Sequence, residues 1–122
     1  MERIPFGIES LDTTIGGGAP RGSVVLLSGE AGAGSREFLH TAAAMNGIAE
    51  ADEELFDLHY GELAENATLP GEVHYISFAG SEDQFRAELR MSMDEDIAET
   101  GLENLNFTSL ANNYFHNSPV PR

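Results

Sequence analysis

The sequence predicts an α/β protein in which helices flank a parallel sheet. Apolar runs typical of strands alternate with amphipathic segments typical of helices, and turn signals separate them. A glycine-rich turn directly follows the first apolar run, as in many parallel α/β proteins. The predicted strands are Ser23–Ser28, Val73–Phe78 and Leu105–Leu110. We expect them to pair in parallel, because a helical segment separates each strand from the next.

The loop after the first predicted strand has the spacing of a phosphate-binding loop. Such loops read Gly-x-x-x-x-Gly-Lys-Ser/Thr, where Lys reaches the phosphates and the hydroxyl binds Mg²⁺. Gly29 and Gly34 are correctly spaced, but Ser35 stands at the lysine position and Arg36 at the hydroxyl position. Backbone N–H groups and a helix N-terminus can still attract an anion. The candidate nucleotide-binding residues, for a weak and degenerate loop, are Gly29, Glu30, Ala31, Gly32, Ala33, Gly34, Ser35 and Arg36.

A helix is expected from about Ser35 toward Gly47, followed by an acidic insertion at about residues 49–68. In the first helix, the spacing of Phe38, Ala42 and Met45 predicts a buried stripe. The insertion is predicted to form an amphipathic helix with an acidic outer face, using apolar side chains from the set Leu55, Phe56, Leu58 and Leu63. The insertion has two interpretations, a docking surface for a partner or a solvent-exposed helix with no binding role. Acidic runs are more often solvent-exposed helices of the second kind.

A further helix is predicted after the second strand. Ser81 to Gln84 has the pattern of a capping box, which opens a helix. Its core side is expected to carry Phe85, Leu89 and Met93. On its outer side, the spacing predicts ion pairs of Glu82 with Arg86 and of Arg90 with Asp94. The tail, residues 112–122, is expected to be irregular or extended.

The charge balance predicts a halophilic protein. The chain has 21 Asp and Glu against 6 basic residues, all arginine, and a net charge of −15. Such a chain repels itself at low salt, whereas molar salt shortens the Debye length to about 3 Å. We therefore expect an archaeal cytoplasm rich in KCl and a fold that is lost at low salt. No basic stripe favours nucleic acid, and no apolar run is long enough to insert into a membrane.

Three blocks of sequence resemble the KaiC/RecA-like P-loop ATPases. The lead-in Phe6–Ser23 matches the family pattern at Gly7, Asp12 and Gly22, among other positions, and the degenerate loop follows it. Val73–Phe85 resembles the family's second core strand. The resemblance implies one RecA-like domain over residues 1–122, of which only the N-terminal half is present, with ATP as the family ligand. Because half a sheet leaves unpaired edges, we expect a longer chain or a partner to complete it.

The same resemblance shows which catalytic groups are missing. The family's glutamate base would fall at Ala79 or Gly80, neither of which can accept a proton, and Glu82 is displaced into the capping box. The aspartate that supports Mg²⁺ would come from a later strand. The four histidines lack metal-ligand spacing. We therefore expect no catalytic residue and no metal site, and at most weak binding of ATP or another nucleotide.

Three functions remain open on the sequence. The first is a non-catalytic relative of the KaiC/RecA-like ATPases that acts in regulation or signalling through a protein partner or self-association. The second is a working ATPase with an altered loop, in which Ser35 or Arg36 contacts phosphate. The third is an accessory protein of DNA repair or recombination, which rests on fold analogy alone. The missing lysine and glutamate disfavour the second and the missing basic loop disfavours the third.

Overall fold

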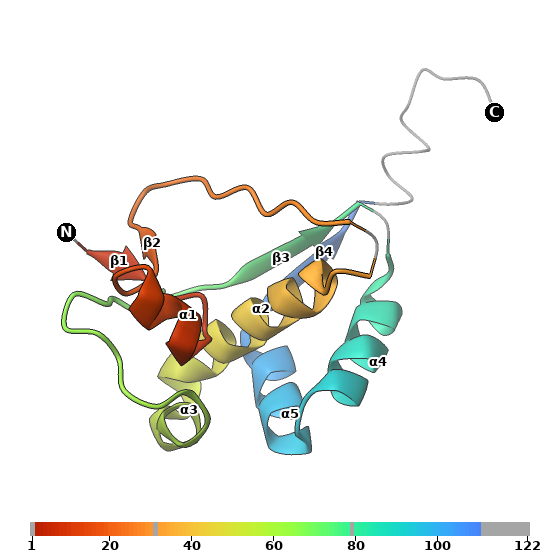
Figure 1. The fold of residues 1–122 in the computed structure, drawn as a ribbon. Coiled ribbons are helices and arrows are strands. Elements are labelled where there is room, and N and C mark those ends of the chain that lie inside the picture. The colour runs from red at the N-terminus through yellow and green to blue at the C-terminus, as the bar shows by residue number, and fades with distance from the viewer. Residues whose placement is uncertain (1, 31, 79, 111–122) are drawn as a thin grey trace.

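The computed structural model describes residues 2–30, 32–78 and 80–110. Figure 1 shows its short strands and its helices. In chain order these are β1 (Arg3–Ile4), α1 (Glu9–Thr14), β2 (Ala19–Pro20), α2 (Ser35–Ala51), α3 (Glu53–Tyr60), β3 (His74–Ser77), α4 (Glu82–Ser92), α5 (Glu95–Asn104) and β4 (Asn106–Ser109). Strands β1 and β2 pair antiparallel, and β3 and β4 pair in parallel.

Helix α2 is the element against which α3 and α5 pack. The contact with α5 includes Ala44 and Gly47, α3 lies near the C-terminal end of α2, and α4 packs on α5 (Figure 1). Gly101 allows α5 to approach α2 closely, since a Cβ at this position would lie only 3.0 Å from the Cβ of Ala44. Ile48 and Leu89 are fully buried in the core that these helices share. Burial of this apolar surface supplies most of the stability of such a helical layer.

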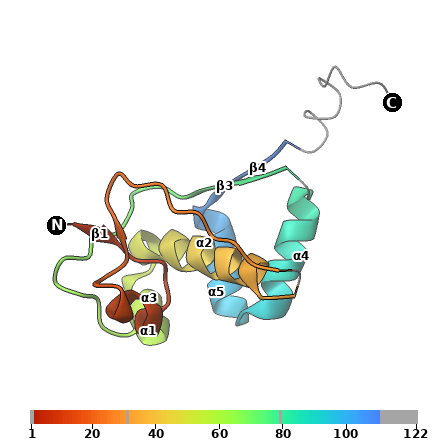
Figure 2. The ribbon, with the colours of Figure 1, turned by 45° about the horizontal axis from the view of Figure 1, so that its top comes forward.

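The parallel pair β3–β4 lies over this helical layer. Its register places Tyr75 opposite Phe107. In both strands exposed and half-buried residues alternate, as expected for strands with helices on one face only. Tyr75 and Phe107 point to the helices, where both rings contact Phe85. Figure 2 shows the helices on one side of this sheet. The two strands and their parallel pairing are confirmed, and each is shorter than predicted.

The N-terminal lead-in is held by one buried carboxylate. Asp12 of α1 accepts hydrogen bonds from the backbone N–H of Phe6 at 2.8 Å and of Gly7 at 3.2 Å. It also accepts the hydroxyl proton of Tyr60, from α3, at 2.7 Å. Burial and this bond to Asp12 raise the pKa of Tyr60. The acidic insertion is therefore tied to the lead-in through its buried face, as a structural helix.

The predicted first strand, Ser23–Ser28, is wrong for this structure. Residues 23–29, which we call the arm, run extended over the molecule without regular secondary structure (Figure 1). Val24 is 98% exposed and Leu26 is 89% exposed. A strand needs a neighbouring strand for its hydrogen bonds, and no strand within the described residues pairs with the arm. Within the described residues the parallel sheet therefore has two strands, and a RecA-like sheet is not shown.

Some predicted helix faces also need correction. Ser81 caps α4 as predicted, accepting the N–H of Gln84 at 3.1 Å, and Arg86 pairs with Glu82 at 2.9 Å. Arg90 pairs with Glu99 of α5 at 2.7 Å, and the predicted pair with Asp94 is wrong, because α5 folds back beside α4. Leu58 is exposed, since Phe56 and Tyr60 form the buried face of α3. The predicted tail, residues 112–122, lies outside the described residues.

Candidate functional site

Two glycines of the glycine-rich loop have left-handed backbone angles. Gly32 and Gly34 have φ values of +85° and +87°, which side chains other than glycine rarely adopt. Gly34 precedes α2 directly, so the helix begins at Ser35, and no side chain caps its first turn. The free N–H groups of this turn therefore point toward solvent, as a phosphate site requires. An open cavity of about 430 Å³ lies here, lined by Gly29, Glu30, Gly32, Gly34, Ser35, Arg36 and Glu37. Of the predicted loop residues, Ala31 lies outside the described residues.

The charges around this cavity are mostly of the wrong sign for phosphate. Glu30 and Glu37 both line it. The cation that lines it, Arg36, binds Glu88 of α4 instead, with 3.1 Å between Nη1 and Oε1. Arg36 thus forms a surface ion pair with a carboxylate of another helix. The loop therefore offers backbone donors without an unpaired positive side chain among the described residues.

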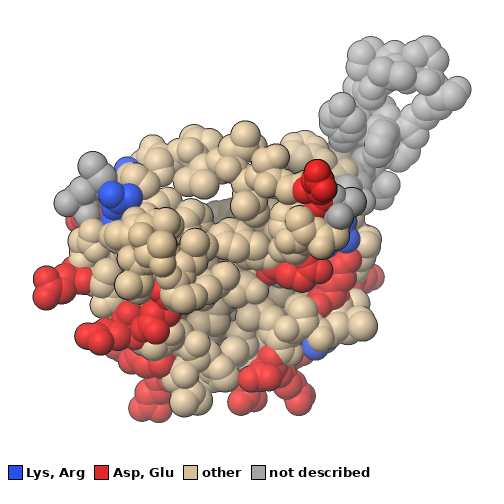
Figure 3. Space-filling model, viewed as in Figure 1, with Lys and Arg blue, Asp and Glu red and all other residues tan. Residues whose placement is uncertain are grey.

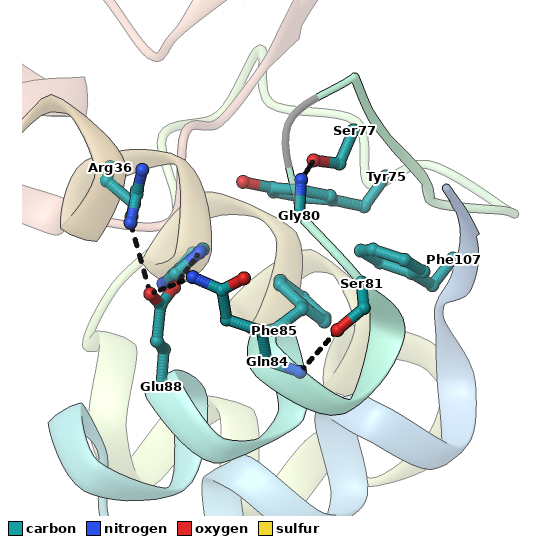
Figure 4. Close-up of a pocket in the computed structure, with 10 residues that line it drawn as sticks. Arg36, Tyr75, Ser77, Gly80, Ser81, Gln84, Phe85, Glu88 and Phe107 are labelled. Atoms are coloured by element: carbon teal, nitrogen blue, oxygen red, sulfur yellow. Dashed lines mark hydrogen bonds and ion pairs between the residues drawn. The ribbon is translucent and has the colours of Figure 1, made fainter. Parts of the chain in front are cut away.

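The side chain of Arg36 belongs to a second, smaller cavity beside the loop (Figure 4). It has a volume of about 60 Å³ and lies between the start of α2, the end of β3 and the start of α4. Its polar centre is Glu88, whose two carboxylate oxygens face Arg36 and His40. The distance from His40 Nε2 to Glu88 Oε2 is 3.7 Å, and Gln84 Nε2 lies 3.5 Å from Oε1. Aromatic rings of Tyr75, Phe85 and Phe107 close the inner end.

Burial sets the protonation of the two titratable rings in this cavity. His40 is 3% exposed, and its burial lowers its pKa, which nearby Glu88 partly offsets. Burial likewise raises the pKa of Tyr75, with Arg36 acting in the opposite direction. At neutral pH both rings are therefore uncharged. Because the His40 ring packs against Tyr75 and Phe85 at centroid distances of 5.7 and 5.1 Å, it acts as a core residue with one polar edge.

The turn after β3 holds the positions where the resemblance implied a catalytic base. Gly80 donates its N–H to Ser77 Oγ at 3.1 Å, and its carbonyl accepts from Ser109 Oγ at 2.8 Å. Glu82 is paired with Arg86 and does not line either cavity described above. Ala79 lies outside the described residues. The residues do not fit magnesium-bound ATP, since Arg36 replaces the hydroxyl ligand and binds a carboxylate.

Glu88 and His40 are site residues that the sequence analysis missed. His40 stands four positions after Arg36, a spacing that places two side chains on one helix face and could have linked them. Glu88 gives no such signal, because 52 residues separate it from Arg36. Only the packing of α4 beside α2 brings them together.

Within residues 2–30, 32–78 and 80–110, no group of three or more His, Asp or Glu side chains is placed to hold a metal ion. The described helices include none that is both long and apolar enough to span a membrane. No protein-family model matches this chain, and neither a curated protein nor a solved structure matches it.

Proposed function

We propose that this chain is a non-catalytic relative of the KaiC/RecA-like ATPases that acts through protein contacts in regulation or signalling in a halophile. The observation that carries the proposal is the ion pair of Arg36 with Glu88, which directs the cation of the loop away from the phosphate position. The sequence resemblance supports the choice of family, and the degenerate loop supports the absence of catalysis.

The electrostatics of the loop support loss of nucleotide affinity. At about 4 Å and an effective dielectric constant of about 20, one charge–charge contact is worth about 4 kcal/mol before desolvation. The missing lysine forfeits one attraction of this kind, and Glu30 and Glu37 add repulsion at the cavity. The backbone at Gly32 and Gly34 remains suited to an anion. These opposing terms favour weak binding of nucleotide or none.

Catalysis lacks a base as well as a charge. A general base typically contributes about 10²–10⁴ in rate. Gly80 stands at one of the two base positions implied by the resemblance, and the nearby Glu82 forms an ion pair with Arg86. Because the base and the lysine act on different steps, the loss of both favours a protein without ATPase activity.

The arginine contacts disfavour a role on nucleic acid. Among the described arginines, Arg21, Arg36, Arg86 and Arg90 are all paired with carboxylates. Arg3 donates to the carbonyl of Gly18 at 3.3 Å. Binding to a phosphate backbone requires arginines that can replace counterions. No described arginine is placed to do so without giving up a protein contact.

Calorimetric titration with MgATP in molar KCl, together with phosphate release, tests the proposal. We expect phosphate release equal to a blank without protein, and heats too small to define a site. Ser35→Lys restores the missing cation at the first residue of α2 and should increase the heat of binding without producing turnover. Ser10→Lys makes the same substitution at an exposed position of α1, outside the cavity lining, and is the matched control. Turnover above the blank in the unmodified protein would establish the altered-loop ATPase instead.

A further inference from the structure

The backbone of the arm has no hydrogen-bond partner. Within the described residues, no hydrogen bond involves the backbone of residues 24–29. The apolar run Val24–Leu27 lies in this segment and has high β propensity. Val24 and Leu26 are the most exposed of its side chains. A segment that is extended, apolar and unpaired is a template for strand pairing.

Strand β3 has a free edge. On one side, Asn106 N–H donates to the carbonyl of Val73, and Leu110 N–H donates to the carbonyl of Ser77, both at 2.8 Å. Parallel pairing uses alternate residues, so the backbone groups of His74 and Ile76 point to the opposite edge. Within the described residues no strand pairs with that edge. Ile76 also exposes its side chain on the sheet face that faces away from the helices.

A groove lies beside this edge. It has a volume of about 340 Å³ and runs between α2 and the start of β3. Ala42 and Ala43 of α2 line it together with Val73 and Tyr75, and Leu39 is partly open to solvent there. Both ribbon views place the arm and β3 over α2, and the space-filling view shows openings beneath the arm (Figures 1, 2 and 3). Small alanine side chains leave room for one more strand on top of α2.

One acidic side chain, Glu72, lines the groove, and its carboxylate lies 3.2 Å from His74 Nε2. Four segments around the groove contain no acid, although about one residue in six of the chain is Asp or Glu; they are residues 20–29, 38–49, 73–81 and 104–110. In Figure 3 the acidic side chains gather mainly on the lower half, and the arm above is tan along most of its length. On a molecule of net charge −15, a second copy therefore meets little repulsion along these segments.

We propose that the arm of a second copy enters this groove and adds as a strand to the free edge of β3. The arm fits because Val24–Leu27 is uncharged, β-prone and as long as β3. Glycines near both ends of the arm, Gly22 and Gly32, have positive φ and open space around them, so the segment can swing outward. Mutual exchange of arms gives a closed dimer in which both grooves are filled. The inference rests on the proposed function, and it names the partner and the surface.

Cross-linking between differently labelled copies tests this assignment, since the chain contains no cysteine. A Leu26→Cys copy is mixed with an Ile76→Cys copy in molar KCl without nucleotide, and the mixture is oxidised mildly. Adjacent strands bring Cα atoms within about 5.5 Å, which a disulfide spans. We expect a covalent dimer in this mixture, and Val24→Cys serves as the alternative register. Leu58→Cys, on α3 and equally apolar and exposed, is the matched control and should give only background.

Light scattering on the unmodified protein should give the mass of a dimer. Leu26→Glu should yield a monomer with an unchanged circular dichroism spectrum, because it places an acid in the exchanged strand without touching the core. A peptide of residues 22–30 in excess should reduce the cross-link.

A monomer without cross-link above the Leu58→Cys control would overturn the proposal. So would a disulfide formed only inside single chains that carry both cysteines, because the arm then pairs with its own β3. Filling of the groove by a strand of another sequence, with copies that never cross-link, would overturn it as well. The proposed function fails separately, since turnover of ATP would refute it and leave the cross-link unaffected.

Discussion

The two sides of α2 differ in how completely they are covered. On one side, α3 and α5 bury Ala44, Ile48 and their neighbours in a continuous core, with α4 packed on α5. On the other side lie the groove, the free edge of β3 and the arm, whose apolar side chains face solvent. The helical side therefore satisfies its own hydrogen bonds and buries its own apolar surface. On the sheet side, the outer edge of β3 and the arm pair with no strand within the described residues.

This difference follows from the kind of hydrogen bonding in each element. A helix closes its backbone bonds within itself and needs neighbours only for its apolar face. A strand depends on another strand for every backbone bond. The same chain can therefore complete a helical layer and leave the sheet open. Stability is expected to come from the helical side, and interaction with other proteins from the sheet side.

The largest expected effect comes from one substitution made on each side. Leu89→Ala removes a side chain that is 0% exposed and should lower the free energy of unfolding by about 2–5 kcal/mol. Leu26→Ala makes the same change in the arm and should alter it by less than about 0.5 kcal/mol. Urea denaturation in molar KCl, at a protein concentration that keeps the chain monomeric, measures both. Equal losses would show that the arm is packed, and would remove the contrast between the sides.

The contrast also explains which elements could be predicted from the sequence. Local β propensity indicates the strand around Tyr75, local alternation the strand around Phe107, and a local pattern the cap at Ser81, and all three predictions are confirmed. Residues 23–28 have an equally strong strand pattern. Their state depends on whether another strand lies beside them, and local sequence carries no information on that. The predicted ion pair of Arg90 with Asp94 is wrong for a similar reason, because the partner of Arg90, Glu99, lies on another helix.

The second prediction concerns the bond that ties α3 to the lead-in. Tyr60→Phe removes the hydroxyl that donates to Asp12 and leaves a buried carboxylate with one donor fewer. The free energy of unfolding should fall by about 1–3 kcal/mol. Tyr75→Phe is the matched control, since no hydrogen bond of the Tyr75 hydroxyl occurs among the described residues. If both variants lose equal stability, the hydroxyl bond to Asp12 is not what holds the insertion.

The third prediction concerns how the stability depends on pH, through the buried ring of His40. The folded-state pKa of His40 lies below its unfolded value of 6.5 because burial disfavours the imidazolium. Protons therefore bind preferentially to the unfolded chain. The contribution of neutral, buried His40 to the free energy of unfolding is fully present above pH 6.5. It should fall as the pH drops below that value toward the folded pKa.

Urea denaturation at several pH values, for the unmodified protein and for His40→Gln, measures this contribution. The carboxylates Glu88 and Glu37 and the cation Arg36 act on the same ring, so the comparison uses the difference between the two proteins. The variant should lose less stability on acidification than the unmodified protein. An identical pH dependence would show that His40 stays neutral in both states or titrates equally in both.

The site was harder to predict than the fold. The loop spacing of Gly29 and Gly34 was visible in the sequence, and so was the absence of lysine. Whether Arg36 could replace that lysine depends on where its side chain points, which is decided by Glu88 on α4. That contact arises from the packing of two helices and has no local signature. The missing lysine could therefore be read from the sequence, and the position of the Arg36 side chain could not.

The smallest expected effect comes from Arg36→Ala. The side chains of Arg36 and Glu88 are 61% and 32% exposed, and exposed ion pairs contribute only about 0–1 kcal/mol. Removing Arg36 also removes a positive charge that lowers the pKa of His40, so the variant should lose slightly less stability in acid. Phosphate release should stay at the blank in both proteins, because Arg36 binds a carboxylate and not a nucleotide.

Glu88→Gln breaks the same pair from the other end and releases Arg36 toward the loop. If Glu88→Gln gained nucleotide binding that Arg36→Ala lacked, the ion pair would be what holds the loop inactive. If neither variant differed from the unmodified protein, the missing lysine alone would account for the loss.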